Sequence, residues 1–227
     1  MRRALVIILA ISLAYAGVDV FRPLQRDLRQ FDPAAVARLE TQMWRSYYER
    51  RPVALFLELA EMLRTQSRFP MLRSYVGAYY GTLAAFVFKQ GGQRADFEKA
   101  LPALQVYFRM FRNTGNANLD VRRAAALELE WWIVHRNRAN YPPGALGRAC
   151  AEASAYAYQV PAHATLAHGE LRATAMLLRD ERADAGRMND ADWRQIETLL
   201  LHSYQALQEG LAGVAVTSAP LPASGSN

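Results

Sequence analysis

The fold is decided by the segment 32–50, which reads DPAAVARLETQMWRSYYER. It opens with Asp32, a residue type that caps helix N-termini, and with Pro33, which suits the first helical position. Apolar and aromatic residues then recur at steps of three and four: Val36, Leu39, Met43 and Tyr47. This spacing puts them on one face of an α-helix, so we expect an amphipathic helix that turns this face toward a core.

Seven further segments are expected to be helical, separated by proline, glycine and asparagine-rich breaks. The expected helices are 32–50, 52–69, 71–90, 96–112 with a kink at Pro102, 120–138, 145–159, 161–185 and 191–212. No segment has the alternating pattern of a strand. The sequence therefore predicts an all-α protein, a single antiparallel bundle of about eight helices joined by short links. Stacked helical hairpins are the alternative, although no repeat consensus is found.

One of these helices has an unusual composition. Its residues from Ser74 to Phe88 include no charged side chain. Fifteen residues are too few to cross a bilayer comfortably, so we expect a central helix that is buried on all sides.

The N-terminus, MRRALVIILAISLAYAGVDVF (1–21), predicts an anchor or a signal peptide. Arg2 and Arg3 precede a long apolar run, and the stretch from Ala4 to Phe21 is just long enough to cross a membrane. Ala14-Tyr15-Ala16 also fits a signal peptidase site. We favour an uncleaved, single-pass anchor in a bacterial-type inner membrane with the body in the periplasm. The alternative is secretion after cleavage following Ala16.

The remaining organisation follows from composition. Residues 22–31 are expected to link the anchor (1–21) to one helical domain (32–213), and residues 214–227 to form a disordered tail. The chain of 227 residues has a net charge of +6, but its basic residues are spread along every segment. Because no basic block or binding motif is present, we expect no nucleic-acid partner. A single cysteine, Cys150, excludes a disulfide within the chain.

Acidic and imidazole side chains fall on helix faces that are expected to point inward. Glu40 lies on the stripe described above, Glu128 and His135 share a face two turns apart, and His168 lies on another apolar stripe. Helical bundles build dinuclear iron or manganese sites from such groups, so Glu40, Glu128, His135 and His168 are candidate metal ligands. The paired Glu-x-x-His motif of ferritin-type sites is missing.

A structural explanation of the same residues competes with the metal site. In it, Glu40 pairs with an arginine of another helix, and Glu128 is satisfied by Arg122, Arg123 or a tyrosine hydroxyl. His135 is then a histidine at a helix C-terminus, where a positive ring is favourable.

The sequence leaves two functional hypotheses. The first is a membrane-tethered, non-catalytic binding or assembly module, which docks onto a protein of a larger membrane complex. The alternative is a carboxylate/histidine oxidoreductase that activates oxygen at a dinuclear iron or manganese site. No catalytic residue and no firm cofactor is assigned, and the chain resembles no characterised family that we recognise.

Overall fold

The computed structural model describes residues 2–217, and within that range it contains helices and no strand. The α-helices are α1 (Arg2–Phe21), α2 (Pro33–Tyr48), α3 (Pro52–Thr65), α4 (Met71–Gln90), α5 (Arg94–Phe97), α6 (Leu101–Thr114), α7 (Val121–Arg136), α8 (Ala145–Tyr158), α9 (Leu166–Asp184) and α10 (Asp190–Thr217). Three short 3-10 helices join some of them: Glu98–Ala100, Arg138–Asn140 and Ala162–Thr165. The predicted all-α fold is confirmed.

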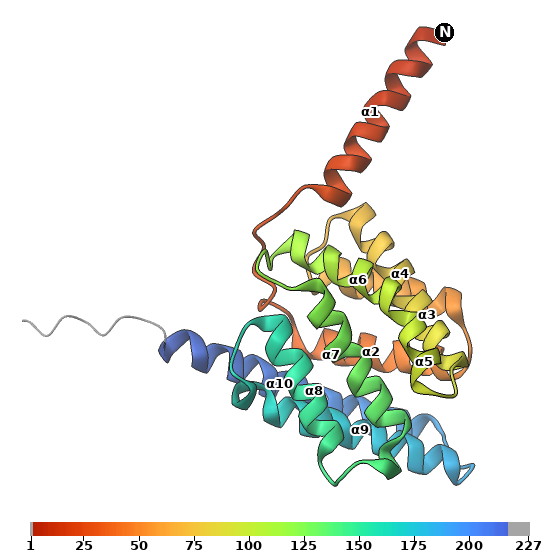
Figure 1. Cartoon of the computed structure of the whole chain (residues 1–227), viewed down its shortest axis with the longest axis vertical. Coiled ribbons are helices and arrows are strands. Elements are labelled where there is room, and N and C mark those ends of the chain that lie inside the picture. The colour runs from red at the N-terminus through yellow and green to blue at the C-terminus, as the bar shows by residue number, and fades with distance from the viewer. Residues whose placement is uncertain (1, 218–227) are drawn as a thin grey trace, which may run out of the picture.

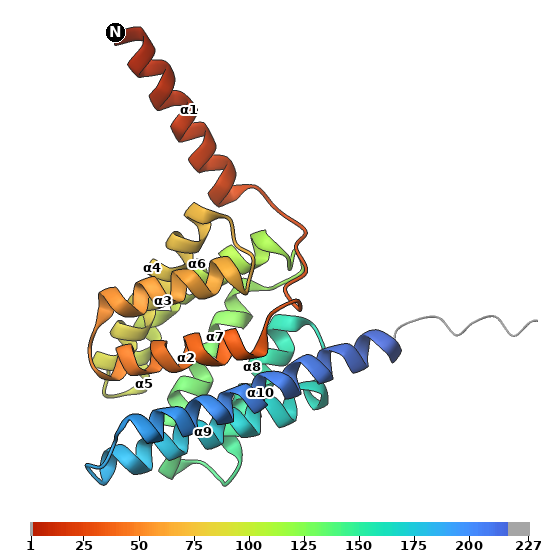
Figure 2. The same ribbon diagram turned by 180° about the vertical axis from the view of Figure 1, so that it is seen from behind.

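Eight of these helices form a closed ring. Going round it, α2, α3, α4, α6, α7, α8, α9 and α10 each pack against the next, and α10 returns to pack against α2. Figures 1 and 2 show α3, α4 and α6 on the side of the ring near α1, and α8, α9 and α10 on the far side. Helices α2 and α7 lie between these two groups (Figure 1). The predicted bundle of about eight helices is therefore confirmed, and its helices surround a common centre.

Helix α2 begins as the sequence predicts. The carboxylate of Asp32 accepts a hydrogen bond of 2.9 Å from the backbone N–H of Ala34, and Pro33 occupies the first turn. Val36 and Leu39 are buried on the inner face. The cap and the apolar stripe together fix which face of α2, and thus which side of Glu40, points into the ring.

Helix α1 projects away from the ring and is long and apolar enough to span a membrane or to serve as a signal sequence. Its last turn is held by Arg73 of α4, whose side chain is fully buried. The Arg73 guanidinium donates to the backbone carbonyls of Asp19 (3.0 Å) and Arg22 (2.6 Å). The Asp19 carboxylate accepts from the Arg73 backbone N–H at 3.0 Å. A cation thus caps the C-terminus of α1 and fastens it to the ring.

Two expectations about the helices near Pro102 and in α4 are wrong. Segment 96–112 is not one kinked helix, because α5 and a 3-10 helix precede α6, and Pro102 lies in the first turn of α6. Proline is tolerated there because that turn has no helical partner for its N–H. Helix α4 is not buried on all sides, since Tyr75, Tyr79 and Leu83 are exposed.

The C-terminal helix is longer than expected. Helix α10 continues to Thr217, so residues 214–217 are helical although they belong to the stretch expected to be disordered. The rest of that stretch, residues 218–227, lies outside the described residues.

Candidate functional site: a cavity inside the helical ring

The ring encloses a cavity of about 370 Å³, to which every one of its eight helices contributes side chains. Most of the wall is apolar or aromatic, with rings from α6 and α7 prominent: Tyr107, Phe108, Phe111, Trp131 and Trp132. The size and composition are those of a small-molecule pocket, which is mostly apolar and carries a few polar groups. Glu40, Glu128, His135 and His168 all line it.

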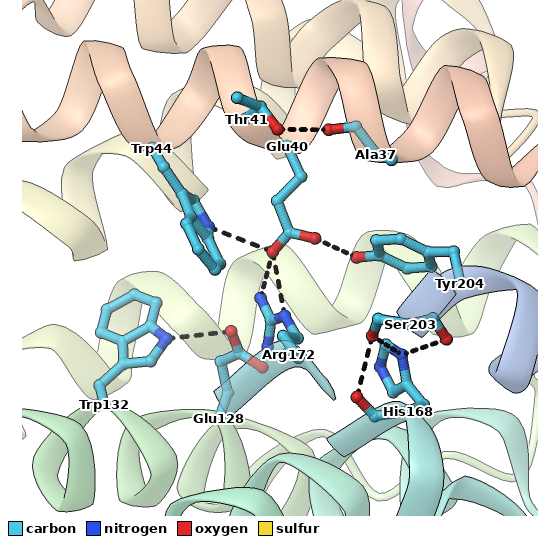
Figure 3. A network of polar contacts seen from close by, with 10 residues as sticks. All are labelled: Ala37, Glu40, Thr41, Trp44, Glu128, Trp132, His168, Arg172, Ser203 and Tyr204. Carbon is cyan, nitrogen blue, oxygen red and sulfur yellow. Dashed lines mark hydrogen bonds and ion pairs between the residues drawn. The ribbon is translucent and has the colours of Figure 1, made fainter. Parts of the chain in front are cut away.

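Glu40 lies at the centre of a buried network (Figure 3). Its Oε1 accepts from the Nε of Arg172 at 3.0 Å and from the indole N–H of Trp44 at 3.2 Å. Its Oε2 accepts from the Tyr204 hydroxyl. These partners come from α9, α2 and α10, so the predicted pairing of Glu40 with an arginine of another helix matches the geometry. A buried carboxylate needs such partners, because an unpaired charge inside the protein is costly.

Arg172 also stacks on an aromatic ring. Its Cζ lies 4.5 Å from the centroid of a Trp131 ring. Burial by itself lowers the pKa of Arg172, but the Glu40 carboxylate raises it well above its usual value. Arg172 and Glu40 therefore form a charged pair with no net charge in the cavity wall.

Glu128 has a different environment from Glu40. Its Oε1 accepts from the indole N–H of Trp132 at 3.1 Å, and both residues are on α7 (Figure 3). The prediction that Arg122, Arg123 or a tyrosine forms a hydrogen bond with this carboxylate is wrong. Trp132 does so instead, because it lies one helical turn away on the same face of α7. Burial raises the pKa of Glu128, while the charge of Arg172 opposes this shift. The environment therefore favours the protonated form of the Glu128 carboxyl.

His168 on α9 is tied to α10. Its Nδ1 lies 2.8 Å from the Ser203 hydroxyl and 3.1 Å from the Ser203 carbonyl oxygen. The Ser203 hydroxyl donates to the His168 carbonyl at 2.9 Å. Because the Ser203 hydroxyl donates its proton to this carbonyl, it can only accept from the ring, so we assign Nδ1 as the protonated nitrogen of His168. Burial lowers the pKa of His168 to about 4, and the Arg172 charge adds to this effect. His168 is thus a neutral, structural histidine.

His135 is paired at the C-terminal end of α7. Its Nε2 lies 3.0 Å from the carboxylate of Asp180, which also receives Arg138 at 2.8 Å and Arg179 at 3.1 Å. Burial opposes ionisation of Asp180, but the hydrogen bond with His135 and the neighbouring cations lower its pKa overall. His135 therefore belongs to an ion cluster at the edge of the cavity.

The four candidate metal ligands share one cavity but have separate partners. Arg172 binds Glu40, Trp132 binds Glu128, Asp180 binds His135 and Ser203 binds His168. Within residues 2–217, no group of three or more His, Cys, Asp or Glu side chains is arranged to hold a metal ion. Metal binding by Glu40, Glu128, His135 and His168 stays a prediction.

The sequence analysis missed Arg172 and Tyr204, which complete the network. Arg172 follows His168 by four residues, so it shares the inward face of α9, and this spacing is the signal that reveals it. Tyr204 follows the buried Leu200 in the same way on α10. Cys150, which is fully buried, carries no reactive thiolate, because burial raises the pKa of its thiol to about 12.

Comparison of the chain with protein-family models, with curated proteins and with solved structures gives no match.

Proposed function

We propose that this protein is a membrane-tethered binding protein whose central cavity holds a largely apolar small molecule. The sequence predicted a binding module without naming its site or ligand, and this proposal assigns it one site and one class of ligand. A non-catalytic role is proposed, since the buried acids, bases and thiol described above are each engaged in structural contacts or kept in an unreactive form.

The cavity wall is the observation that carries the proposal. A closed ring of helices packed for stability alone fills its centre with side chains, because interiors are close-packed. Here a space of about 370 Å³ remains, lined by aromatic rings. The charges of Glu40 and Arg172 in its wall cancel each other, and Tyr204 donates a further hydrogen bond to Glu40. An apolar ligand fills such a space and leaves the partners of Glu40 and Arg172 in place.

The tether gives the cavity its setting. In this proposal α1 is an uncleaved anchor, Arg2 and Arg3 remain on the cytoplasmic side, and the ring lies in the periplasm. The buried cap by Arg73 holds the end of α1 against the ring at Asp19 and Arg22, which lie beyond Ala16 and are present with or without cleavage. A membrane-bound position favours ligands that partition into lipid.

Photolabelling tests the proposal with the full chain in lipid nanodiscs. The probe is a dodecanol that carries a diazirine, a neutral ligand that forms covalent adducts where it lies when illuminated. Tryptic peptides report the position: 124–136 contains Glu128, Trp131 and Trp132, whereas 4–26 contains most of α1. We expect adducts on 124–136 as well as on the anchor peptide, which serves as an internal reference for probe in the bilayer.

Two cavity-filling variants and a matched control complete the test. Ala153→Phe and Ala85→Leu place bulk inside the cavity, and Ala126→Phe adds a ring to the exposed face of α7. The account requires labelling of 124–136 to fall in the filled variants, with circular dichroism and thermal unfolding confirming their folds, and to persist in Ala126→Phe. Labelling confined to α1 in the unmodified protein would refute the proposed function.

A further inference from the structure

Cations lie behind the wall at one end of the cavity. The cavity follows α2 from Val36 to Tyr48, a length of roughly 18 Å at 1.5 Å per residue. At the far end, the rings of Tyr47, Tyr48 and Phe88 form the wall. This end is opposite to the one where the linker enters the ring.

Each of these three rings carries a cation. The Nζ of Lys89 lies 4.2 Å from the Tyr47 ring centroid, and the Cζ of Arg179 lies 3.2 Å from that of Tyr48. The Cζ of Arg136 lies 5.1 Å from the Phe88 ring centroid. Burial and then the charges of Arg50, Arg179 and Arg136 lower the pKa of Lys89, which places these four cations within electrostatic range of one another.

The acidic groups nearby do not balance these charges. Asp180 is shared by His135, Arg138 and Arg179, and Asp184 lies 3.5 Å from Arg138. Glu49, the acid next to Arg50 in the sequence, pairs with Arg45 and Arg51.

Three cations are left over. Across the described part of the chain, no acidic side chain forms an ion pair with Arg50, Lys89 or Arg136. The hydrogen bonds that Lys89 donates to the Tyr47 and Tyr48 carbonyls hold its position but supply no full negative charge. These cations are not part of the cavity wall, and Arg50 and Arg136 are exposed, but together they place uncompensated positive charge behind the rings at this end.

The middle of the cavity carries no such excess. The Arg172 charge is cancelled by Glu40, and burial raises the pKa of Glu128, which disfavours a second negative charge there. An anionic group placed there would meet the Glu40 carboxylate, whereas at the Tyr47 end the nearby carboxylate, Asp180, is already paired with Arg138 and Arg179. The opposite end, with Phe31, Leu28 and Leu207, is apolar.

We propose that the ligand is an amphipathic anion, with its carboxylate or phosphate head beside Arg50, Lys89 and Arg136 and its apolar chain along α2 toward Phe31. This inference rests on the proposed function and assigns the chemistry of the same cavity. A single-chain fatty acid and a single-chain alkyl phosphate share the required chemistry. Guanidinium and ammonium groups attract such heads through their positive charge.

The test compares heads on one chain, again with the full protein in nanodiscs of zwitterionic lipid. Diazirine-bearing dodecanoic acid and dodecanol are the probes, and dodecyl phosphate, dodecylamine and inorganic phosphate are competitors. The variants are Arg136→Gln and the double variant Arg50→Gln/Arg136→Gln. Both lose the trypsin site after residue 136, so their reporting peptide is 124–138. Lys89 is left unchanged because it also caps α2. Arg109→Gln, an exposed arginine on α6, is the control of equal charge change.

We expect the acid to label 124–136 at lower concentration than the alcohol does, and dodecyl phosphate to compete better than dodecylamine. Acid affinity should fall about threefold in Arg136→Gln and about tenfold in the double variant. Alcohol labelling should stay constant in these variants, and Arg109→Gln should match the unmodified protein.

Three results would overturn this inference while leaving the proposed function standing: equal labelling by acid and alcohol, no loss of acid affinity in the double variant, or stronger competition by the amine. Displacement of the acid by inorganic phosphate as effectively as by dodecyl phosphate would show a site for a free anion and would also overturn it. Absence of labelling by both probes at 124–136 would instead refute the proposed function.

Discussion

Arg172 on α9 and Glu40 on α2, 132 positions apart in sequence, form an ion pair across the wall of the cavity, with 3.0 Å between the arginine Nε and the carboxylate Oε1. The pair joins two helices that do not follow one another around the ring, since α10 lies between them. Its contribution to folding is therefore testable as a long-range interaction.

Removing the Arg172 side chain should destabilise the folded protein strongly. Arg172→Leu leaves the Glu40 carboxylate buried without its cation, and we expect a loss of about 3–5 kcal/mol in the free energy of unfolding. The double variant Glu40→Leu/Arg172→Leu should recover most of this loss, because no buried charge remains. Urea unfolding of both single variants and the double variant measures the coupling. Additive effects would mean that the two groups do not stabilise the fold as a pair.

Glu128 should destabilise the fold at neutral pH. The folded protein retains its proton above the ordinary carboxyl pKa of 4.5, at which the unfolded chain releases it. Stability from this group is thus present at low pH and is lost as pH rises. We expect Glu128→Gln to raise the melting temperature by a few degrees at pH 8 and to have little effect at pH 4. Glu152→Gln, on the exposed face of α8, should show no such dependence.

His168 should make the protein sensitive to acid. Its pKa is lowered from 6.5 to about 4, so the unfolded chain binds a proton in this window while the folded protein does not. Stability should therefore be lost as pH falls from 6.5 to 4, by roughly 3 kcal/mol for this group. His168→Gln should flatten this part of the pH profile relative to the exposed control His202→Gln. Parallel profiles for the two variants would contradict the assignment.

Arg73 should control how firmly α1 is held. Arg73→Met removes the donors to the Asp19 and Arg22 carbonyls, so the junction between α1 and the ring should open more often. We expect trypsin to cleave after Arg26, the first susceptible site beyond α1, several times faster in this variant, with the exposed control Arg64→Met unchanged. Equal cleavage rates in the two variants would show that the cap does not hold the helix.

Much of the fold could be predicted because helix signals are local. Asp32 and Pro33 mark the start of α2, and the apolar spacing that follows identifies its inner face. Closure of the ring could not be predicted, since the contact of α10 with α2 depends on the sum of many small packing angles. Pro102 was misread because a proline within an apparent helix and one at a helix start give the same local pattern.

The site was predicted in part. Helix phase correctly turned Glu40, Glu128, His135 and His168 toward one cavity. Helix phase does not tell which side chain forms a hydrogen bond with each of them. The pairing of Glu128 with Trp132 and the roles of Arg172 and Tyr204 therefore required the structure. The excess positive charge around Lys89 could not be predicted either. Its four cations, Lys89, Arg136, Arg179 and Arg50, come from three separate helices and from the turn after α2.

Quenching of tryptophan fluorescence by a brominated dodecanoic acid tests the central claim most directly. Trp44, Trp131 and Trp132 line the cavity, whereas Trp193 does not line it and α1 contains no tryptophan. With the full chain in nanodiscs, the account predicts saturable loss of most of the emission, a residual signal from Trp193, and markedly weaker quenching in Ala153→Phe. Emission that stays constant while the acid is present in the bilayer, or equal quenching in the filled variant, would contradict it.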